Sequence, residues 1–361
     1  MTTGRLSGTV RIVGAGLLGT SVGLALRALG VDVVIEDSSP ANEKLAIDYG
    51  AGRAASAEDS PNLIVVCVPP DVTGKVVAAE LAANPHAVVT DVASVKASVL
   101  ADLRARGVDL SRYVGSHPMA GRERGGAISG RADLFVSRPW VISASSSNSA
   151  ASVQLVENLA LDLGAAPVRV PAEDHDRAVA LVSHVPQLVS SLLAARLVEA
   201  EAGDVALAGQ GLRDTTRIAA SDPKLWMQIL GANSAPIARV LHELADDLSK
   251  VVVAMDDVDA PGSLATIGRV LEAGNRGVER IPGKHGTKHT AYAQLVVIIE
   301  DKPGELGRLF NEVGEIGVNI EELKLEHSPS AQVGLVELYV LPGVADRLGA
   351  ELSARGWRIA G

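Results

Sequence analysis

The sequence predicts an α/β chain of three parts: a parallel α/β domain, an all-helical domain and a ferredoxin-like α+β domain. Short apolar runs alternate with helical patterns through roughly the first 170 residues, which is typical of a parallel sheet. Long helical patterns follow, and the last part of the chain returns to strands and helices. We therefore expect domains at 1–171, 172–275 and 291–361, with a linker at 276–290.

The composition bounds the class of protein. With 361 residues, 47% of them hydrophobic, the chain can bury two or three cores. A net charge of -10 argues against nucleic acid as a partner. We find no continuous apolar stretch of membrane-span length and no signal-peptide pattern, so we expect a cytoplasmic protein without a membrane partner. The single cysteine, Cys67, lies in an apolar run and is expected to be a small buried strand residue.

A dinucleotide fingerprint follows the first predicted strand. Strands are expected at 9–13, 31–35, 63–68 and 87–91, and the segment after the first reads Gly14-Ala15-Gly16-Leu17-Leu18-Gly19. In this spacing the first glycine permits a tight turn, the second lets the backbone approach a pyrophosphate, and the third lets the helix pack on the strand. With a helix expected at 18–29, the pattern predicts a Rossmann-type nucleotide site.

Two further segments fit that site. An acidic pair, Glu36-Asp37, ends the second strand, where a carboxylate binds both ribose hydroxyls and repels a 2'-phosphate. Asp37 is the preferred residue, and NAD is favoured over NADP. The stiff turn Val68-Pro69-Pro70 ends the strand at 63–68 and is expected to border the nicotinamide.

Two later motifs place candidate catalytic groups near this crevice. Ser94, in the segment Asp91-Val92-Ala93-Ser94-Val95-Lys96, can cap the following helix or project its hydroxyl into the crevice. His117 lies in Gly115-Ser116-His117-Pro118-Met119-Ala120-Gly121, beyond an expected strand end. A histidine beside a nucleotide site is a natural acid or base for a dehydrogenase.

In their order and spacing, these motifs resemble the prephenate and arogenate (cyclohexadienyl) dehydrogenases of tyrosine biosynthesis. The resemblance implies oxidation of a cyclohexadienyl alcohol, with hydride passing from C4 to the nicotinamide and loss of CO2. A neutral imidazole at His117 can accept the proton of the C4 hydroxyl, and Ser94 can hold that hydroxyl in place. Prephenate, arogenate or both remain open as the substrate.

The resemblance also assigns residues to the pocket and to its mouth. Arg217 is expected to clamp a substrate carboxylate, because a guanidinium offers a two-pronged planar donor. Trp226 is placed near the pocket. Glu123 and Asp214 are implied to form an ionic network that gates the site, although an exposed charged loop explains Glu123 equally well.

A long helix is expected from Ala172 to Leu197. Its His175 and His184 are nine residues apart, which at about 100° per residue puts them on opposite faces and excludes a simple paired metal site. His184 and Gln187 share a face, and they lie in a Ser-His-x-Pro-x segment that lines the pocket in the family it resembles. Some members carry a second histidine where this chain has Gln187, which leaves the substrate preference open.

An apolar stripe in the next long helix needs a partner. Its members recur at spacings of three and four: Ile237, Val240, Leu241, Leu244, Leu248, Val251 and Val252. The helical segment is too thin to bury every stripe itself. We therefore expect a homodimer, which the resemblance also implies.

The linker and the C-terminal unit follow. His285 and His289, in the linker, have metal-pair spacing, but their glycine-rich surroundings favour a solvated loop, so no metal is expected. The last seventy or so residues show strand-helix-strand-strand-helix-strand order and resemble an ACT domain. Such a domain binds a small effector, here expected to be tyrosine, and Gly304 and Asn319 are the expected contacts. A purely structural role for the domain remains open.

Two functions of other classes were weighed. A 3-hydroxyacid-type dehydrogenase shares the glycine fingerprint but relies on a lysine deep in its helical domain. A non-enzymatic NAD-binding protein could use an ACT domain to sense an amino acid. The combination of Ser94, His117 and Arg217 argues against both.

Overall fold

The computed structural model describes residues 4–122, 125–282, 292–327 and 333–360. By its internal packing the chain forms two units, Met1–Ala245 and Asp246–Gly361. Each unit is described by itself.

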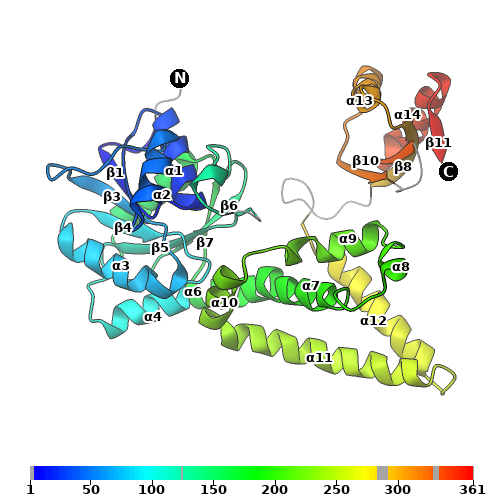
Figure 1. Cartoon of the computed structure of the whole chain (residues 1–361), viewed down its shortest axis with the longest axis horizontal. Helices are drawn as coiled ribbons and strands as arrows, with labels where there is room; N and C mark the ends of the chain where they lie inside the picture. The colour runs from blue at the N-terminus through cyan, green and yellow to red at the C-terminus, as the bar shows by residue number, and fades with distance from the viewer. Residues whose placement is uncertain (1–3, 123–124, 283–291, 328–332, 361) are drawn as a thin grey trace. The chain divides into compact units, whose positions relative to one another are not determined.

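A seven-stranded sheet forms the first part of the N-terminal unit (Figure 1). Its order is β2-β1-β3-β4-β5-β6-β7. The first five strands are mutually parallel, β6 runs antiparallel to β5, and β7 is parallel to β6. The strands are β1 (Thr9–Val13), β2 (Asp32–Glu36), β3 (Pro61–Val66), β4 (Val88–Asp91), β5 (Tyr113–Pro118), β6 (Pro139–Ser143) and β7 (Ala166–Arg169). The Rossmann-type fold is confirmed, with the last two strands, β6 and β7, running opposite to the other five.

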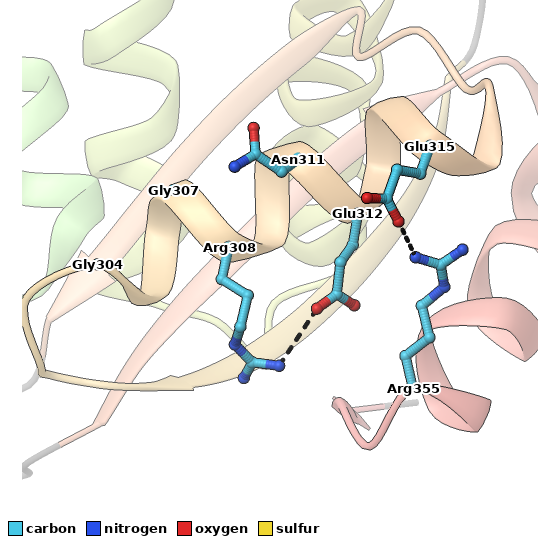
Figure 2. A pocket seen from close by; sticks show the side chains of 7 residues that line it. All are labelled: Gly304, Gly307, Arg308, Asn311, Glu312, Glu315 and Arg355. Atoms are coloured by element: carbon cyan, nitrogen blue, oxygen red, sulfur yellow. Dashed lines mark hydrogen bonds and ion pairs between the residues drawn. The ribbon is translucent and has the colours of Figure 1, made fainter.

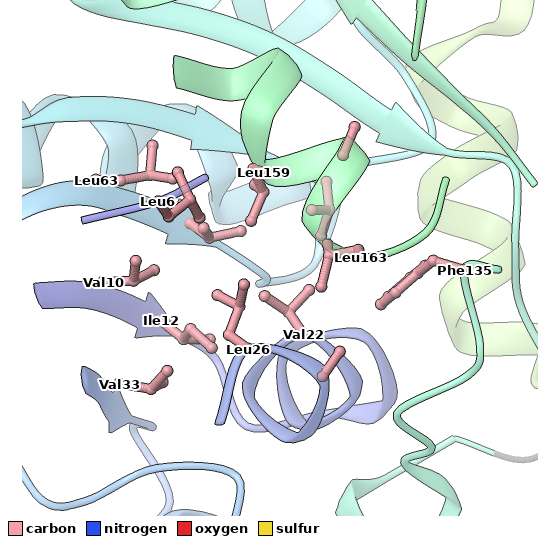
Figure 3. Packing of buried hydrophobic residues seen from close by; sticks show 14 of the residues in the cluster. Leu6, Val10, Ile12, Val22, Leu26, Val33, Leu63, Phe135, Leu159 and Leu163 are labelled. Carbon is pink, nitrogen blue, oxygen red and sulfur yellow. The ribbon is translucent and has the colours of Figure 1, made fainter. Parts of the chain in front are cut away.

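Helices cover both faces of this sheet. They are α1 (Leu17–Ala28), α2 (Pro40–Asp48), α3 (Pro70–Ala83), α4 (Ala97–Ala105) and α5 (Ala150–Asp162), with a 3-10 turn η1 (Ala127–Ser129). Alternate residues of β3 point to opposite faces: Leu63 packs with α1 and α5, and Ile64 packs with α3 and α4. Figure 3 shows the first of these cores around Ile12 and Leu26. Burial on both faces explains why the strands are continuous apolar runs.

The predicted helical region follows the sheet and completes the N-terminal unit. It contains α6 (Ala172–Val179), a π-helical segment η2 (Ala180–His184), α7 (Val185–Ala195), α8 (Ala202–Val205), α9 (Gln210–Thr216), a 3-10 turn η3 (Arg217–Ala219), α10 (Pro223–Ala232) and the first part of α11 (Ser234–Asp256). A small core joins Ala180 and Val185 to Ile237 of α11. The apolar stripe of α11 is therefore buried at its start.

One helical stretch of the described residues, Ala172–Ala195, is long and apolar enough to cross a membrane by length and composition, with a mean hydropathy of 1.6. The stretch is not a continuous apolar run, because it includes Glu173, Asp174 and Arg177. In addition, His175, Asp176 and His184 of this stretch are buried and contact polar groups of other elements. Those contacts are the ones expected of a core helix in a folded domain.

The second unit contains the end of α11, α12 (Ser263–Val278) and the C-terminal fold. That fold consists of β8 (Ala293–Glu300), α13 (Glu305–Ile316), β9 (Glu322–His327), β10 (Val333–Val340), α14 (Pro342–Ala354) and β11 (Arg358–Ala360), and its antiparallel sheet has the order β11-β8-β10-β9. The predicted ferredoxin-like order is confirmed. The expected linker begins too early, because α12 continues to Val278; His285 and His289 lie outside the described residues.

Candidate active site

The carboxyl ends of the parallel strands meet at one edge of the sheet, where ligands bind in open α/β folds. The glycine loop follows β1 at this edge. Gly14 has a φ of +108°, and a Cβ there would lie 2.4 Å from the Cys67 carbonyl oxygen. A Cβ at Gly19 would lie 1.9 Å from the Gly14 carbonyl oxygen, whereas one at Gly16 would meet nothing within 4 Å. The first and third glycines are thus needed for packing, and the second leaves an open approach to the backbone.

Asp37 supports the glycine loop directly. It follows β2, and its Oδ2 accepts a hydrogen bond of 2.7 Å from the backbone N–H of Ala15. Its Oδ1 accepts from the N–H of Ser39. The neighbouring Glu36 instead pairs with Arg11 at 2.7 Å, so Asp37 is the member of the acidic pair that reaches the loop.

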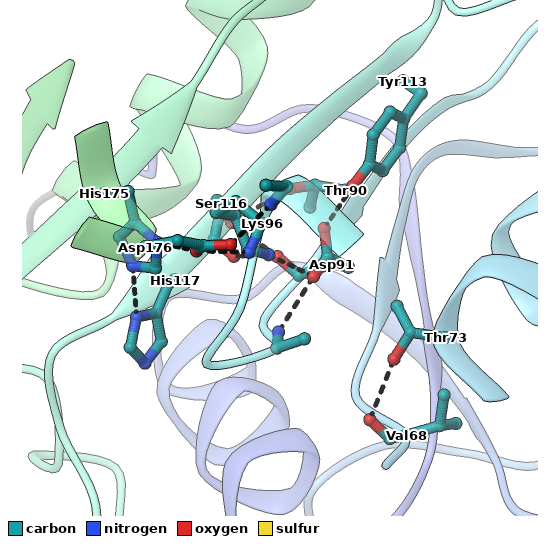
Figure 4. A network of polar contacts seen from close by, with 12 residues as sticks. Val68, Thr73, Thr90, Asp91, Lys96, Tyr113, Ser116, His117, His175 and Asp176 are labelled. Carbon is teal, nitrogen blue, oxygen red and sulfur yellow. Dashed lines mark hydrogen bonds and ion pairs between the residues drawn. The ribbon is translucent and has the colours of Figure 1, made fainter. Parts of the chain in front are cut away.

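The turn Val68-Pro69-Pro70 joins β3 to α3 at the same edge. Pro70 is the first residue of α3, where its missing N–H costs no helical hydrogen bond. The hydroxyl of Thr73 donates to the carbonyl oxygens of Pro69 and Val68, at 2.9 and 3.3 Å (Figure 4). These bonds fix the turn to the first turn of α3.

His117 lies inside β5, opposite Val141 of β6, and not beyond a strand end as the sequence predicted. The reversed strand β6 pairs with β5 alongside this histidine, so the sheet continues beyond β5. Strand β6 was not predicted. Within β5, His117 is one residue from the carboxyl end. It is 9% exposed, and its Nδ1 lies 2.9 Å from Nε2 of His175 (Figure 4).

His175 and Asp176, both on α6, are site residues that the sequence analysis did not assign. Nδ1 of His175 lies 2.7 Å from Oδ1 of Asp176. The carboxylate of Asp176 also accepts the backbone N–H groups of Lys96 and Ala97, each at 2.8 Å. The sequence offered one signal for this pair, namely a histidine followed by an aspartate on a helix with a strong polar stripe. However, His117, the partner of His175, is 58 residues away.

The surroundings of His117 keep its imidazole neutral. Burial lowers its pKa well below the ordinary value of 6.5, and the nearby His175, Lys96 and His184 lower it further. A neutral imidazole has a lone pair with which to accept a proton. The site therefore holds a histidine in the form that a general base needs at neutral pH.

A buried ion pair lies beneath the histidine. Nζ of Lys96 pairs with Asp91 and donates to the carbonyl oxygen of Ser116 at 2.6 Å. The Tyr113 hydroxyl donates to the same aspartate at 2.7 Å. Burial lowers the pKa of Lys96, an effect that the charge of Asp91 opposes, and burial raises the pKa of Tyr113. This network joins the ends of β4 and β5 and fixes the backbone next to His117.

Ser94 lies in the loop between β4 and α4, half-buried. The prediction that it could cap the following helix is wrong, because α4 begins at Ala97 and Asp176 accepts the N–H groups at its start. In the described part of the chain, the Ser94 hydroxyl has no hydrogen-bond partner. It is therefore available to a ligand at the carboxyl edge of the sheet.

His184 and Gln187 lie on the buried side of the helical stretch. Nδ1 of His184 is 3.0 Å from the amide nitrogen of Asn233, and its ring meets Trp226 edge-on at 6.1 Å. Burial lowers the pKa of His184 to about 4. Gln187 donates to the hydroxyl of Ser221 at 2.7 Å. Asn233 and Ser221 were not assigned from the sequence.

The prediction that His175 and His184 lie on opposite helix faces assumed a continuous α-helix. In the structure, residues Ala180–His184 form a π-helical segment with a wider turn. Both histidines are buried, at 2% and 1% exposed. Segments of this kind are frequent at functional sites.

The expected carboxylate clamp and gate lie on the following elements. Arg217 begins the 3-10 turn η3, which packs against α7. Asp214, on α9, accepts a hydrogen bond of 2.8 Å from Gln210. Glu123 lies outside the described residues, so its implied contact with Asp214 stays a prediction.

Comparison with known proteins identifies the family. A family model for the nucleotide-binding domain of prephenate dehydrogenase matches residues 22–169, and one for its dimerization domain matches 171–268. The chain belongs to the prephenate dehydrogenase family. The family predicted from the motifs is confirmed, and both alternatives of another class are set aside.

Relatives of the family resemble this chain over most of its length. The probable prephenate dehydrogenase NovF of Streptomyces niveus is 38% identical, over 97% of this chain and 98% of its own. The cyclohexadienyl dehydrogenase of Zymomonas mobilis is 29% identical, over 69% of this chain and 89% of its own. The crystal structure of prephenate dehydrogenase from Aquifex aeolicus, in complex with hydroxyphenyl propionate and NAD+, covers 76% of this chain and 99% of its own, with 24% identity and a TM-score of 0.66. That structure shows the shared fold.

The C-terminal unit of this prephenate dehydrogenase family member has an open groove of about 620 Å³ along α13 (Figure 2). Gly304, at the start of α13 with a φ of +93°, lines it together with Arg308 and Arg355. The second expected effector contact, Asn319, is exposed, is not among the lining residues and donates to Glu321. The groove is thus built around only one of the two predicted residues.

No group of three or more metal-ligating side chains occurs among the residues that the structure describes.

Proposed function

We propose that this protein catalyses the NAD-dependent oxidative decarboxylation of prephenate to 4-hydroxyphenylpyruvate, a step of L-tyrosine biosynthesis. As a prephenate dehydrogenase family member it is an oxidoreductase that uses NAD. The observation that carries the residue-level proposal is the neutral, buried His117, held by His175 through one ring nitrogen at the carboxyl edge of the sheet. We also propose that the enzyme acts in the cytoplasm.

The residues at the glycine loop fit the cofactor. No side chain caps the N-terminus of α1 at Gly16, and a Cβ there would meet only open space, so backbone N–H groups can approach a pyrophosphate. Leu17, Leu18 and Gly19 form the first turn of that helix. Asp37 would bind the ribose, and the turn Val68-Pro69-Pro70 would border the nicotinamide. When bound, NAD supplies the acceptor for the hydride that leaves C4 of the substrate.

His117 and Ser94 act on the C4 hydroxyl. As hydride leaves C4, the hydroxyl proton passes to the imidazole, and the C4–O bond becomes a carbonyl. Ser94 hydrogen-bonds the same oxygen and orients it. The ring carboxylate then leaves as CO2, and the electron pair of its bond moves through the ring to the C4 oxygen, so that the ring becomes aromatic. The C4 oxygen takes back its proton from the His117 imidazolium, so no separate acid is needed.

Arg217 clamps a substrate carboxylate, and His184, Gln187 and Trp226 line the pocket. The edge-on contact between the buried His184 and the half-buried Trp226 supports this placement, since an aromatic face gives a flat apolar wall. Glu123 and Asp214 are proposed to gate the mouth of the site. The assignments of the clamp, the pocket residues and the gate come from the family motifs.

Arogenate is the second candidate substrate, and Gln187 favours it. The amide nitrogen of Gln187 already donates to Ser221, so its carbonyl oxygen is the atom left for a ligand. An acceptor suits the ammonium group of arogenate better than the keto group of prephenate.

The deciding experiment compares prephenate and arogenate, each with NAD and with NADP, on the purified full-length protein. We expect turnover of prephenate with NAD to have the highest kcat/KM. Faster turnover of arogenate would correct the substrate, and no turnover of either would refute the proposed function.

We also propose a homodimer, with an N-terminal domain at 1–171, a helical domain that continues to the end of α12 at Val278, and a C-terminal domain at 291–361. The support is the apolar surface along the second half of α11, where Leu248 is 60% exposed and Val253 is 71% exposed. A second copy would cover this face. We expect Leu248→Glu with Val253→Glu to give a monomer in sedimentation experiments, while Lys250→Gln on the same helix leaves the dimer intact.

Finally, we propose that the C-terminal fold is an ACT domain that binds tyrosine through Gly304 and Asn319. The ferredoxin-like topology and the left-handed Gly304 before α13 support it. Tyrosine should inhibit the full chain and not a chain that ends near residue 285. Equal inhibition of both forms would instead place tyrosine at the active site.

A further inference from the structure

We propose that His175 and Asp176 are positioning residues that set the tautomer of His117, so that its Nε2 carries the lone pair that accepts the substrate proton. This inference rests on the proposed role of His117 as the base. It adds two residues and a direction of hydrogen bonding that family motifs do not assign. The three side chains come from β5 and α6, two elements of the same unit.

The chain of bonds begins at Asp176. Oδ1 accepts from the backbone N–H of Lys96, and Oδ2 accepts from that of Ala97. These are N–H groups at the start of α4, where a negative charge is favoured. A proton on the carboxyl group would face one of these donors, so the carboxylate is an acceptor only. Nδ1 of His175, at 2.7 Å from Oδ1, must therefore carry the proton and donate.

The direction of the hydrogen bond from His175 to Asp176 then determines the direction of the bond between the two histidines. A neutral His175 with its proton on Nδ1 has a lone pair on Nε2. That nitrogen lies 2.9 Å from Nδ1 of His117, which must therefore donate. The rings meet edge-on, 86° apart, which suits an N–H of one ring pointing at a nitrogen of the other. His117 is left with an unprotonated Nε2 on the opposite side of its ring.

Other groups near His117 agree with this arrangement. The titratable groups that act on it are His175, Lys96 and His184. The Lys96 charge is balanced by Asp91, and it disfavours a second proton on His117 before substrate arrives. Asn233 holds the turn of α6, because its amide donates to the Asp176 carbonyl oxygen at 2.7 Å. Asp176 is thus held at its carboxylate by the start of α4 and at its backbone by Asn233.

The same bonds serve the reaction. When the C4 hydroxyl proton moves to Nε2, the imidazolium keeps its Nδ1–H on His175 and gains the stabilising charge of Asp176 through that ring. His175 keeps its Nδ1 proton in this step, and Asp176 remains a carboxylate. The arrangement parallels the Asp-His pair of serine proteases, in which the carboxylate orients the base and does not become protonated.

The test is Asp176→Asn in the full-length protein. An amide at this position would donate to Nδ1 of His175, which reverses both bonds and places a proton on Nε2 of His117. We expect kcat to fall by about 10²- to 10⁴-fold with the KM for NAD unchanged, as the analogous change does in a protease triad. Asp174→Asn is the matched control, because Asp174 lies on the same helix, is exposed and pairs only with Arg177 among the described residues.

Two further variants separate orientation from packing. A glutamine at position 175 can accept from Nδ1 of His117, whereas a leucine cannot, so His175→Gln should keep at least ten times the kcat of His175→Leu. Equal kcat values for these two variants, or an Asp176→Asn enzyme as active as Asp174→Asn, would overturn the proposal.

A spectroscopic readout does not depend on activity. Nitrogen-15 NMR of the imidazoles in the unsubstituted protein should show the proton of His117 on Nδ1, and Asp176→Asn should move it to Nε2. A proton on Nε2 in the unsubstituted protein would refute the tautomer. By contrast, a correct tautomer in a protein that turns over neither prephenate nor arogenate would refute only the proposed function.

Discussion

The histidine site of the N-terminal unit and the groove along α13 of the C-terminal unit are both built from paired charged and polar side chains, but they differ in burial. His117, His175 and Asp176 are 9%, 2% and 3% exposed. In the groove, Arg308 pairs with Glu312 (Figure 2). It also pairs with Glu305, and its side chain is 47% exposed. The histidine site and the groove therefore make similar contacts, the first in the protein interior and the second at its surface.

The difference decides what each region can do. In a buried site, the loss of one partner leaves a polar group without water, so the hydrogen-bond pattern is strongly selected and a protonation state can be held. At a surface, water replaces a lost partner and salt screens the charges. The interior site is thus suited to a defined proton transfer, and the groove is suited to adjustable binding.

The largest expected effect is at the base itself. His117→Asn should lower kcat by about 10²- to 10⁴-fold, because no other group accepts the hydroxyl proton. Steady-state kinetics measures the loss, and titration with NAD checks that cofactor binding survives. If NAD binding and thermal stability fall together with kcat, His117 has a structural role.

A pair of lysine and arginine changes tests the interior against the surface. Lys96→Met leaves the buried charge of Asp91 unbalanced and should cost about 3–5 kcal/mol of unfolding free energy. Arg355→Met removes a surface pair with Glu315 and should leave the free energy of unfolding nearly unchanged. Urea unfolding of both variants measures the difference. Similar costs would contradict the comparison.

The pH dependence of stability should report the buried His184. Its pKa is about 4 in the folded chain and about 6.5 in the unfolded chain, so between these values the unfolded state binds more protons. Its contribution to stability is present above pH 6.5 and is lost as the pH falls towards 4, by up to about 3 kcal/mol. Unfolding measured at pH 7.5 and 4.5 should show a smaller change in His184→Gln than in the unsubstituted protein.

Arg217→Gln should have the smallest of these effects on the reaction. Loss of a charged donor to a substrate carboxylate should raise the KM by about 10- to 100-fold, equivalent to about 1.5–3 kcal/mol. Arg213→Gln, on the preceding helix, is the control and should leave KM unchanged. An unchanged KM in Arg217→Gln would remove the clamp role.

Local patterns were sufficient for much of the fold. The spacing of Gly14, Gly16 and Gly19 predicted the turn, because close packing against Cys67 and Gly14 leaves no room for a Cβ at two of them. The strand-helix-strand-strand-helix-strand order of the C-terminal unit was also predicted. The reversed β6 was missed, since strand direction is set by pairing with β5 and not by the strand's own residues.

The candidate site was predicted only in part, because local patterns reveal some of its residues and not those whose role depends on distant contacts. Ser94 and His117 stand out because they lie in short motifs beside the glycine loop. Asp176 did not, because its role depends on the start of α4, about 80 residues earlier in the chain. The π-helical turn before Val185 also has no signal in a pattern that assumes 3.6 residues per turn.

The sequence by itself determined the family, the cofactor and the order of the elements, because these depend on residue type and near spacing. The tertiary structure decided which groups face His117 and in which direction its hydrogen bonds run. Those properties arise from burial and from contacts between β5, α4 and α6, which residues distant in the chain create only on folding.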